Sequence, residues 1–177
     1  MNLHYPSAED FLAMGSEIFN RDPDTFRGDP ALRRFMYAFG TEPSNCALLW
    51  KLISDVCQDQ MASGARPVFL LWSLAFLKHG HSAKVMSFML TNGASSPKSV
   101  LKWALHFIEA MSQIDHAKIV DISSAGNFAL EAHNNRIRNF GLVQNQCLHN
   151  HQSSIQRAAA LVVQLNIKEG ILSLSKF

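Results

Sequence analysis

The sequence predicts an all-α protein: a helical bundle that contains a helix-turn-helix-like unit and is followed by a poorly defined C-terminal tail. Between residues 8 and 111, apolar residues recur at intervals of three and four, the spacing of one face of a helix. Serine, aspartate or proline precedes several of these segments and glycine or asparagine follows them, as is typical of helix ends. No segment shows the strict two-residue alternation of a half-buried strand.

The composition fits one globular domain with a core, or a domain and a tail. The chain has 177 residues, of which 47% are hydrophobic and 17% are charged. The hydrophobic share is usual for a globular protein, whereas the charged share is low for a free-standing domain. Part of the apolar surface is therefore expected to contact a second protein or a further domain.

The first two expected helices begin at residues that can cap a helix. Ser7 precedes a short helix over Ala8–Phe19, which has two acidic residues in its first turn. After a turn-rich segment, Asp29 is expected to cap a second helix, which Gly40 ends.

Two further segments are expected to build the core. One is a helical stripe of Cys46, Leu49, Trp50, Ile53 and Cys57. The other, from Pro67 to about Lys78, is apolar nearly all round, as the buried central helix of a bundle usually is. The side chains expected in the core are Trp50, Leu71, Trp72 and Phe76.

Two capped segments then form the outline of a helix-turn-helix DNA-binding unit. Ser82 can cap a helix over Ala83–Leu90, which Asn92-Gly93 terminates. Ser96 can cap the next helix, with Pro97 at its first helical position.

The second helix of this unit has a basic outer stripe, in which Lys98, Lys102 and His106 recur every four residues. Lysine side chains on this stripe can bind phosphate groups or guanine edges in duplex DNA. The alternative is an ordinary solvated helix face. Trp103 lies off the stripe and is interpreted as a core or rim aromatic. The residues expected to contact DNA are Lys84, Ser96, Lys98, Ser99, Lys102 and His106.

Charge is unevenly distributed along the chain, although the net charge is only +2. Residues 1–60 have nine acidic and five basic residues, a net charge of −4. Residues 61–111 have five basic residues and one acidic residue, a net charge of +4, and residues 112–177 have a net charge of +2. The basic block coincides with the expected DNA-binding unit, as attraction to phosphate requires, but a block of this size also arises often by chance.

Three segments carry a resemblance to a known family. They are FMYAFGTEPSNCALLWKLI (Phe35–Ile53), PVFLLWSLAFLK (Pro67–Lys78) and SSPKSVLKWALHFIEAM (Ser95–Met111). In their order and spacing, they resemble the N-terminal region of Harbinger-type transposases and their domesticated relatives. The resemblance covers about half of the chain. It implies a helical DNA-binding region with duplex DNA as its partner.

In that family the helical region precedes a nuclease domain in which three separated carboxylates bind two divalent metal ions, which assist phosphodiester cleavage. Here the nearest candidate for the first carboxylate, Asp121, lacks the Gly-Thr sequence that follows it in the family. Glu131 and Glu169 lie in no recognisable strand pattern. The chain is therefore expected to bind DNA without nuclease activity. The other function left open is a helical protein-interaction module derived from a transposon.

The apolar pattern changes after about residue 121. Residues 1–28 are expected to form an N-terminal segment, residues 29–120 the helical domain, and residues 121–177 a divergent tail that is partly helical or disordered. Within the tail, Ser154–Leu165 can form one amphipathic helix.

No cofactor or metal is expected. Cys46 and Cys57 lie in apolar helical patterns, which favours buried free thiols over disulfides. The tract Cys147–His151 contains zinc-ligand residue types but no second ligand pair at motif spacing, so chance clustering is the favoured interpretation.

A nuclear or otherwise intracellular location is expected, because the N-terminus has no basic and apolar signal pattern. The longest apolar run, Val68–Leu77, is too short to span a bilayer, so no membrane contact is expected.

Overall fold

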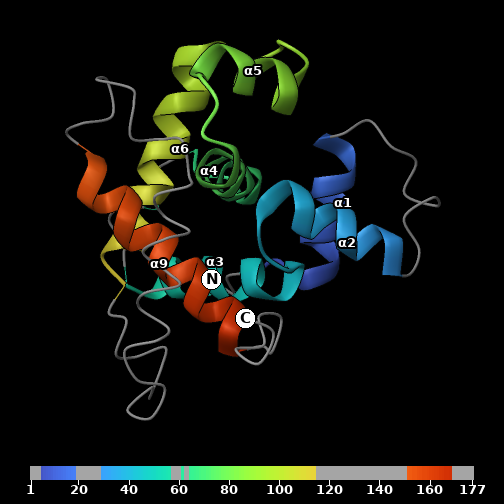
Figure 1. Ribbon diagram of the computed structural model, residues 1–177, viewed down its shortest axis with the longest axis vertical. Coiled ribbons are helices and arrows are strands. Elements are labelled where there is room, and N and C mark those ends of the chain that lie inside the picture. The colour runs from blue at the N-terminus through green and yellow to red at the C-terminus, as the bar shows by residue number, and fades with distance from the viewer. Residues whose placement is uncertain (1–4, 19–28, 57–60, 62–63, 115–150, 169–177) are drawn as a thin grey trace, which may run out of the picture.

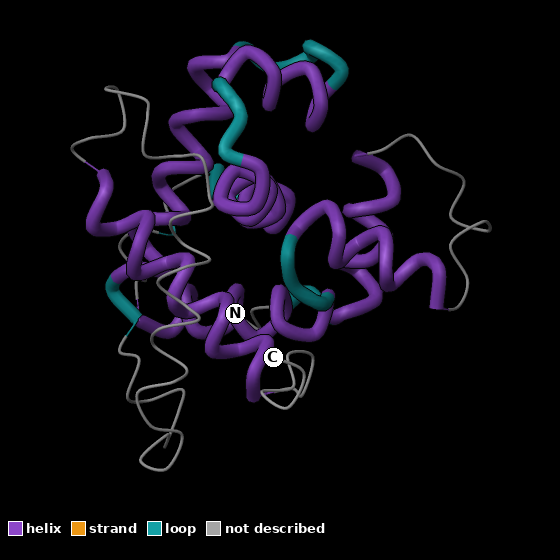
Figure 2. The backbone as a smooth tube through the Cα atoms, viewed as in Figure 1, coloured by secondary structure: helices purple, strands orange, loops and turns teal. Residues whose placement is uncertain are grey.

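The computed structural model describes residues 5–18, 29–56, 61, 64–114 and 151–168. Within these ranges the chain is all-helical and forms no strand, which confirms the predicted all-α class (Figures 1 and 2). The helices are α1 (Ala8–Ile18), α2 (Asp29–Phe39), α3 (Pro43–Val56), α4 (Pro67–His79), α5 (Ala83–Thr91), α6 (Pro97–Ser112) and α9 (Gln152–Lys168).

Serine caps begin three of these helices, as predicted. At α1, the Ser7 hydroxyl accepts from the Asp10 backbone N–H at 3.2 Å, and the Asp10 carboxylate accepts from the Ser7 N–H at 2.8 Å. This reciprocal pair satisfies two N–H groups that a helix start leaves without partners. Ser82 and Ser96 accept from the third residue of α5 and of α6 in the same way. The side chain of Asp29, the predicted cap of α2, lies outside the described residues.

Residues with left-handed backbone conformation end three helices, and two of these residues, Gly40 and Asn92, were predicted helix ends. Gly40, Gly80 and Asn92 have φ angles of 77°, 61° and 50°. Glycine adopts this conformation without steric cost, and asparagine tolerates it better than most residues. The Gly40 N–H donates to the Met36 carbonyl at 2.8 Å, which closes the last turn of α2.

Helix α4 lies at the centre of the bundle and is seen nearly end-on in Figure 1. It contacts α1, α2, α3 and α6, and all its residues from Leu70 to Leu77 are buried. A helix surrounded in this way has no face for polar residues, which explains its nearly uniform apolar sequence. The four side chains predicted for the core, Trp50, Leu71, Trp72 and Phe76, are all buried.

Helix α9 packs on α6 and joins the same core. It contains the predicted helix Ser154–Leu165 and extends beyond it at both ends. Its buried apolar residues are Ile155, Ala158, Ala159, Leu161, Val162 and Leu165. This part of the sequence after residue 121 is therefore integral to the bundle, whereas residues 121–150 and 169–177 lie outside the described residues.

A buried polar cluster attaches the end of α9 to the loop between α2 and α3. The Asn166 side-chain amide donates to the Gly40 carbonyl at 2.8 Å, and its oxygen accepts from the Thr41 hydroxyl at 2.6 Å. The Asn45 amide donates to the Thr41 hydroxyl and to the Asn166 oxygen. Because all three side chains are buried and mutually bonded, the cluster fixes where α9 docks.

Candidate nucleic-acid interface

Helices α5 and α6 are joined by a short turn that side-chain hydrogen bonds hold in place. The buried Ser87 hydroxyl donates to the Ser95 carbonyl just before α6. The Thr91 hydroxyl donates to the Ser87 carbonyl at 2.7 Å and accepts from the Ser95 N–H at 3.1 Å. These bonds fix the direction in which the chain enters α6. Ser87 and Thr91 were not predicted from the sequence, although hydroxyl residues in the last turns before Asn92-Gly93 were an available signal.

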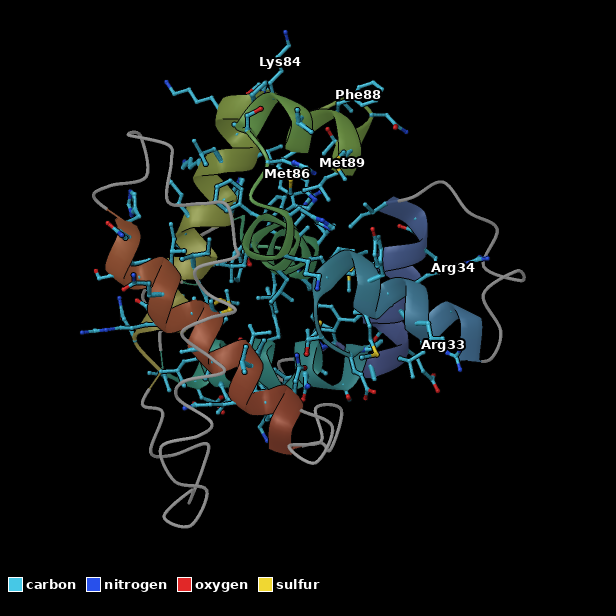
Figure 3. The ribbon with its side chains drawn as sticks, in the orientation of Figure 1. Arg33, Arg34, Lys84, Met86, Phe88 and Met89 are labelled. Atoms are coloured by element: carbon cyan, nitrogen blue, oxygen red, sulfur yellow. The ribbon has the colours of Figure 1, made fainter. Side chains whose placement is uncertain are left out.

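The three lysines predicted to contact DNA are all exposed. Lys84 lies in the first turn of α5 and extends outward in Figure 3, while Lys98 and Lys102 lie one turn apart on α6. The Lys102 ammonium lies 5.7 Å from the centre of the Trp103 ring. No aspartate or glutamate occurs between residues 60 and 108, so no acid within this stretch of the chain offsets these charges.

The two predicted serines lie at the exposed start of α6. The Ser96 hydroxyl accepts from the Ser99 N–H at 3.1 Å and lies 2.9 Å from the Ser99 hydroxyl. Ser96 is therefore primarily the helix cap. The hydroxyl groups of both residues are nevertheless placed in the same turn as Lys98.

The basic stripe does not continue as an exposed face to His106. His106 is half-buried, and its ring packs edge-on against Trp103 and Phe107, with ring centroids 5.5 and 5.6 Å away. One turn further on, the Glu109 carboxylate accepts from the Ser154 hydroxyl of α9 at 2.6 Å. The docking of α9 thus covers the C-terminal half of α6, and the fully exposed part of the predicted stripe is limited to Lys98 and Lys102.

Trp103 is a rim aromatic, as predicted. Its ring is half-buried and stacks on Phe69, with centroids 4.6 Å apart and planes inclined by 19°. This stacking links α6 to α4 and leaves the indole less available to a nucleic-acid base.

The outer side of α5 is apolar as well as basic. Phe88 is 71% exposed and Val85 is 44% exposed, whereas Met86 points into the core (Figure 3). Val85, Phe88 and the half-buried Met89 are called the α5 patch below.

The side chains that could ligate a metal ion are the His, Cys, Asp and Glu side chains of the described residues. No group of three or more metal-ligating side chains occurs among them. Cys46 is buried, as predicted, and burial raises the pKa of its thiol well above the usual range. Cys57, Asp121, Glu131, Glu169 and residues 147–150 lie outside the described part of the chain. None of the described helices is long and apolar enough to cross a membrane.

No family model, curated protein or solved structure matches this chain.

Proposed function

We propose that this chain binds duplex DNA through the unit formed by α5, the turn and α6. The observation that carries the proposal is the exposure of Lys84, Lys98 and Lys102 on two helices joined by a hydrogen-bonded turn. Lysines held in this way can neutralise phosphates and release condensed counterions, which supplies much of the affinity in protein–DNA binding.

The start of α6 offers groups that suit a phosphate backbone. Ser96 and Ser99 place hydroxyls beside Lys98, and positive charge from the helix dipole adds to that of the lysine. Lys102 continues the same face by one turn. In this proposal α6 enters a groove at its exposed N-terminal half, and the half covered by α9 stays away from the DNA.

The resemblance of residues 35–120 to the helical region of Harbinger-type transposases supports the same function. The proposed role is DNA binding without nuclease activity, in the nucleus or elsewhere inside the cell.

The decisive experiment is a mobility-shift titration of the full chain with duplex DNA, between about 50 and about 200 mM salt. The Lys98→Ala/Lys102→Ala variant should bind more weakly, and its plot of log K against log salt should be shallower by about two, because each phosphate contact contributes about one. The matched control is Lys51→Ala/Arg157→Ala, which removes two exposed charges on α3 and α9. Equal affinity and equal slope for the wild type and the Lys98/Lys102 variant would contradict the proposal.

The second candidate function is a helical protein-interaction module. The exposed α5 patch favours it, because aromatic side chains as exposed as Phe88 are common at interfaces. Apolar docking of a protein depends little on salt, whereas DNA binding falls steeply with it. The salt titration therefore also separates the two functions.

A further inference from the structure

The only charged residue of α5 is Lys84, which lies beside the α5 patch in the sequence. Val85 and Phe88 are three residues apart and therefore lie on the same side of α5. Lys84 precedes them, and the nearest acidic residues along the chain are Asp59 and Glu109. A surface that covers the patch well is therefore expected to combine apolar contact with negative charge.

The outer face of α1 has this complementary character. A shallow hollow of about 360 Å³ is lined by Pro6, Asp10, Ala13, Met14 and Glu17. Ala13 and Met14 supply apolar surface, and the carboxylates of Asp10 and Glu17 flank it. The hydrogen bonds from Ser7 to Asp10 hold one of these carboxylates in place.

We propose that two copies of this chain associate, with the α5 patch of each copy seated on the α1 hollow of the other. Phe88 then enters the hollow, and Lys84 lies near the acidic flank, which leaves Lys98 and Lys102 as the lysines that contact DNA in the dimer. The charges of the two helices agree with this pairing, because α1 has three acidic residues and no basic residue, whereas α5 has Lys84 and no acidic residue.

The two surfaces lie on helices that contact each other in the fold. In the proposed pair a two-fold axis relates the two copies, so the contact between the α5 patch and the α1 hollow forms twice. A self-complementary pair of this kind closes as a dimer and does not extend into a filament.

Sedimentation velocity of the full chain, without DNA, tests the association. The wild type should form dimers as its concentration rises, and Phe88→Ser should weaken dimerisation at least about tenfold, as loss of a central apolar anchor does. Tyr37→Ser is the matched control, because Tyr37 is 76% exposed but lies on α2, outside both surfaces. Circular dichroism of each variant checks that the helices remain formed.

Exchange of the charges at residues 84 and 17 tests whether these two residues face each other in the pair. Lys84→Glu and Glu17→Lys should each weaken dimerisation, and the Lys84→Glu/Glu17→Lys chain should regain part of it, because the opposite charges again face each other. A wild type that stays monomeric at every concentration overturns the proposal, including the case in which another protein binds the α5 patch. Dimerisation that Phe88→Ser and Tyr37→Ser affect equally also overturns it. Loss of DNA binding does not bear on this result, since no DNA is present.

Discussion

The Ser87 hydroxyl on α5 donates a hydrogen bond to the Ser95 carbonyl, which lies just before α6. Ser87 is 3% exposed, so water is not available to replace this donor. Ser87→Ala should therefore lower the free energy of unfolding by about 1–2 kcal/mol, as loss of a buried hydrogen bond does. Urea unfolding measures the change. Ser153→Ala, at an exposed position on α9, should stay within about 0.5 kcal/mol of the wild type. Equal effects of the two substitutions would show that the turn does not depend on Ser87.

Substitution of Asn166 should reduce the stability of the protein more than substitution of a typical polar residue of a helix. Asn166→Ala leaves the Gly40 carbonyl, the Thr41 hydroxyl and the Asn45 amide without one of their partners. The expected destabilisation is about 1–3 kcal/mol, because buried polar groups without partners lose their hydration and regain nothing. The exposed residue Gln156, also on α9, provides the control Gln156→Ala.

A double-mutant cycle with Asn45→Ala tests whether the cluster acts as a unit. The double variant should lose less stability than the sum of the two single variants, because the second substitution removes groups that the first already left unpaired. Additive losses would mean that Asn45 and Asn166 stabilise the protein independently.

Local patterns were sufficient to predict the fold class, the serine caps and the central position of α4. These features depend on residues a few positions apart, as Ser96 and Ser99 are. Even the polar interruption of the apolar run is local, since the buried Ser73 hydroxyl donates to the Leu70 carbonyl of its own helix at 2.6 Å.

Contacts between distant segments were not predictable in this way. Nothing in the sequence near Asn166 indicates that it bonds to Gly40 and Thr41, because helical periodicity does not specify which helix packs on which. The exposure of His106 was predicted incorrectly. Its position on α6 suggests an exposed side chain, but its ring is half-buried and packs against Trp103 and Phe107. The lysines of the candidate interface were placed correctly on the surface, whereas the turn that positions them depends on hydroxyl groups without a strong motif.

The size of the Trp72 side chain should be important for the stability of the protein, whereas its hydrogen-bonding group should not. Trp72 is 6% exposed, and its indole N–H has no hydrogen-bond partner. Trp72→Ala should reduce stability by about 3–5 kcal/mol through lost burial and a cavity. Trp72→Phe should lose much less, because it keeps an aromatic ring and removes an unsatisfied donor. Thermal or urea unfolding compares the two. A Trp72→Ala variant within about 0.5 kcal/mol of the wild type would contradict a core position.

Cys46 should be unreactive in the folded protein. The thiolate is the reactive form, and burial raises the pKa of this thiol, so little thiolate forms at neutral pH. The chain has three cysteines, and a Cys57→Ser/Cys147→Ser variant isolates Cys46. Its reaction with a thiol reagent should be slow in buffer and fast in concentrated urea. Rapid reaction in buffer would show that Cys46 is accessible.

His79 should make the protein less stable in acid. Burial lowers the pKa of His79 below its ordinary value of 6.5, and the nearby positive charges of His81 and Lys78 lower it further. The hydrogen bond from the His79 ring to the Ala38 carbonyl, at 2.9 Å, acts in the opposite direction without cancelling the shift. The unfolded chain therefore binds a proton at His79 at a higher pH than the folded chain does.

The sign of the pH effect follows from this difference. The stabilisation that His79 gives to the folded state is fully present above pH 6.5, the ordinary pKa of histidine. It decreases as the pH falls below that value, and the decrease stops below the lowered pKa of the folded state. Unfolding free energies at about pH 7.5 and about pH 5 bracket this range. His79→Gln should lose less stability between the two conditions than the wild type, because glutamine does not titrate. The other seven of the eight histidines are common to both proteins, so their contributions largely cancel in the comparison. An equal acid-induced loss in both proteins would show that His79 has the same affinity for protons in the folded and unfolded chains.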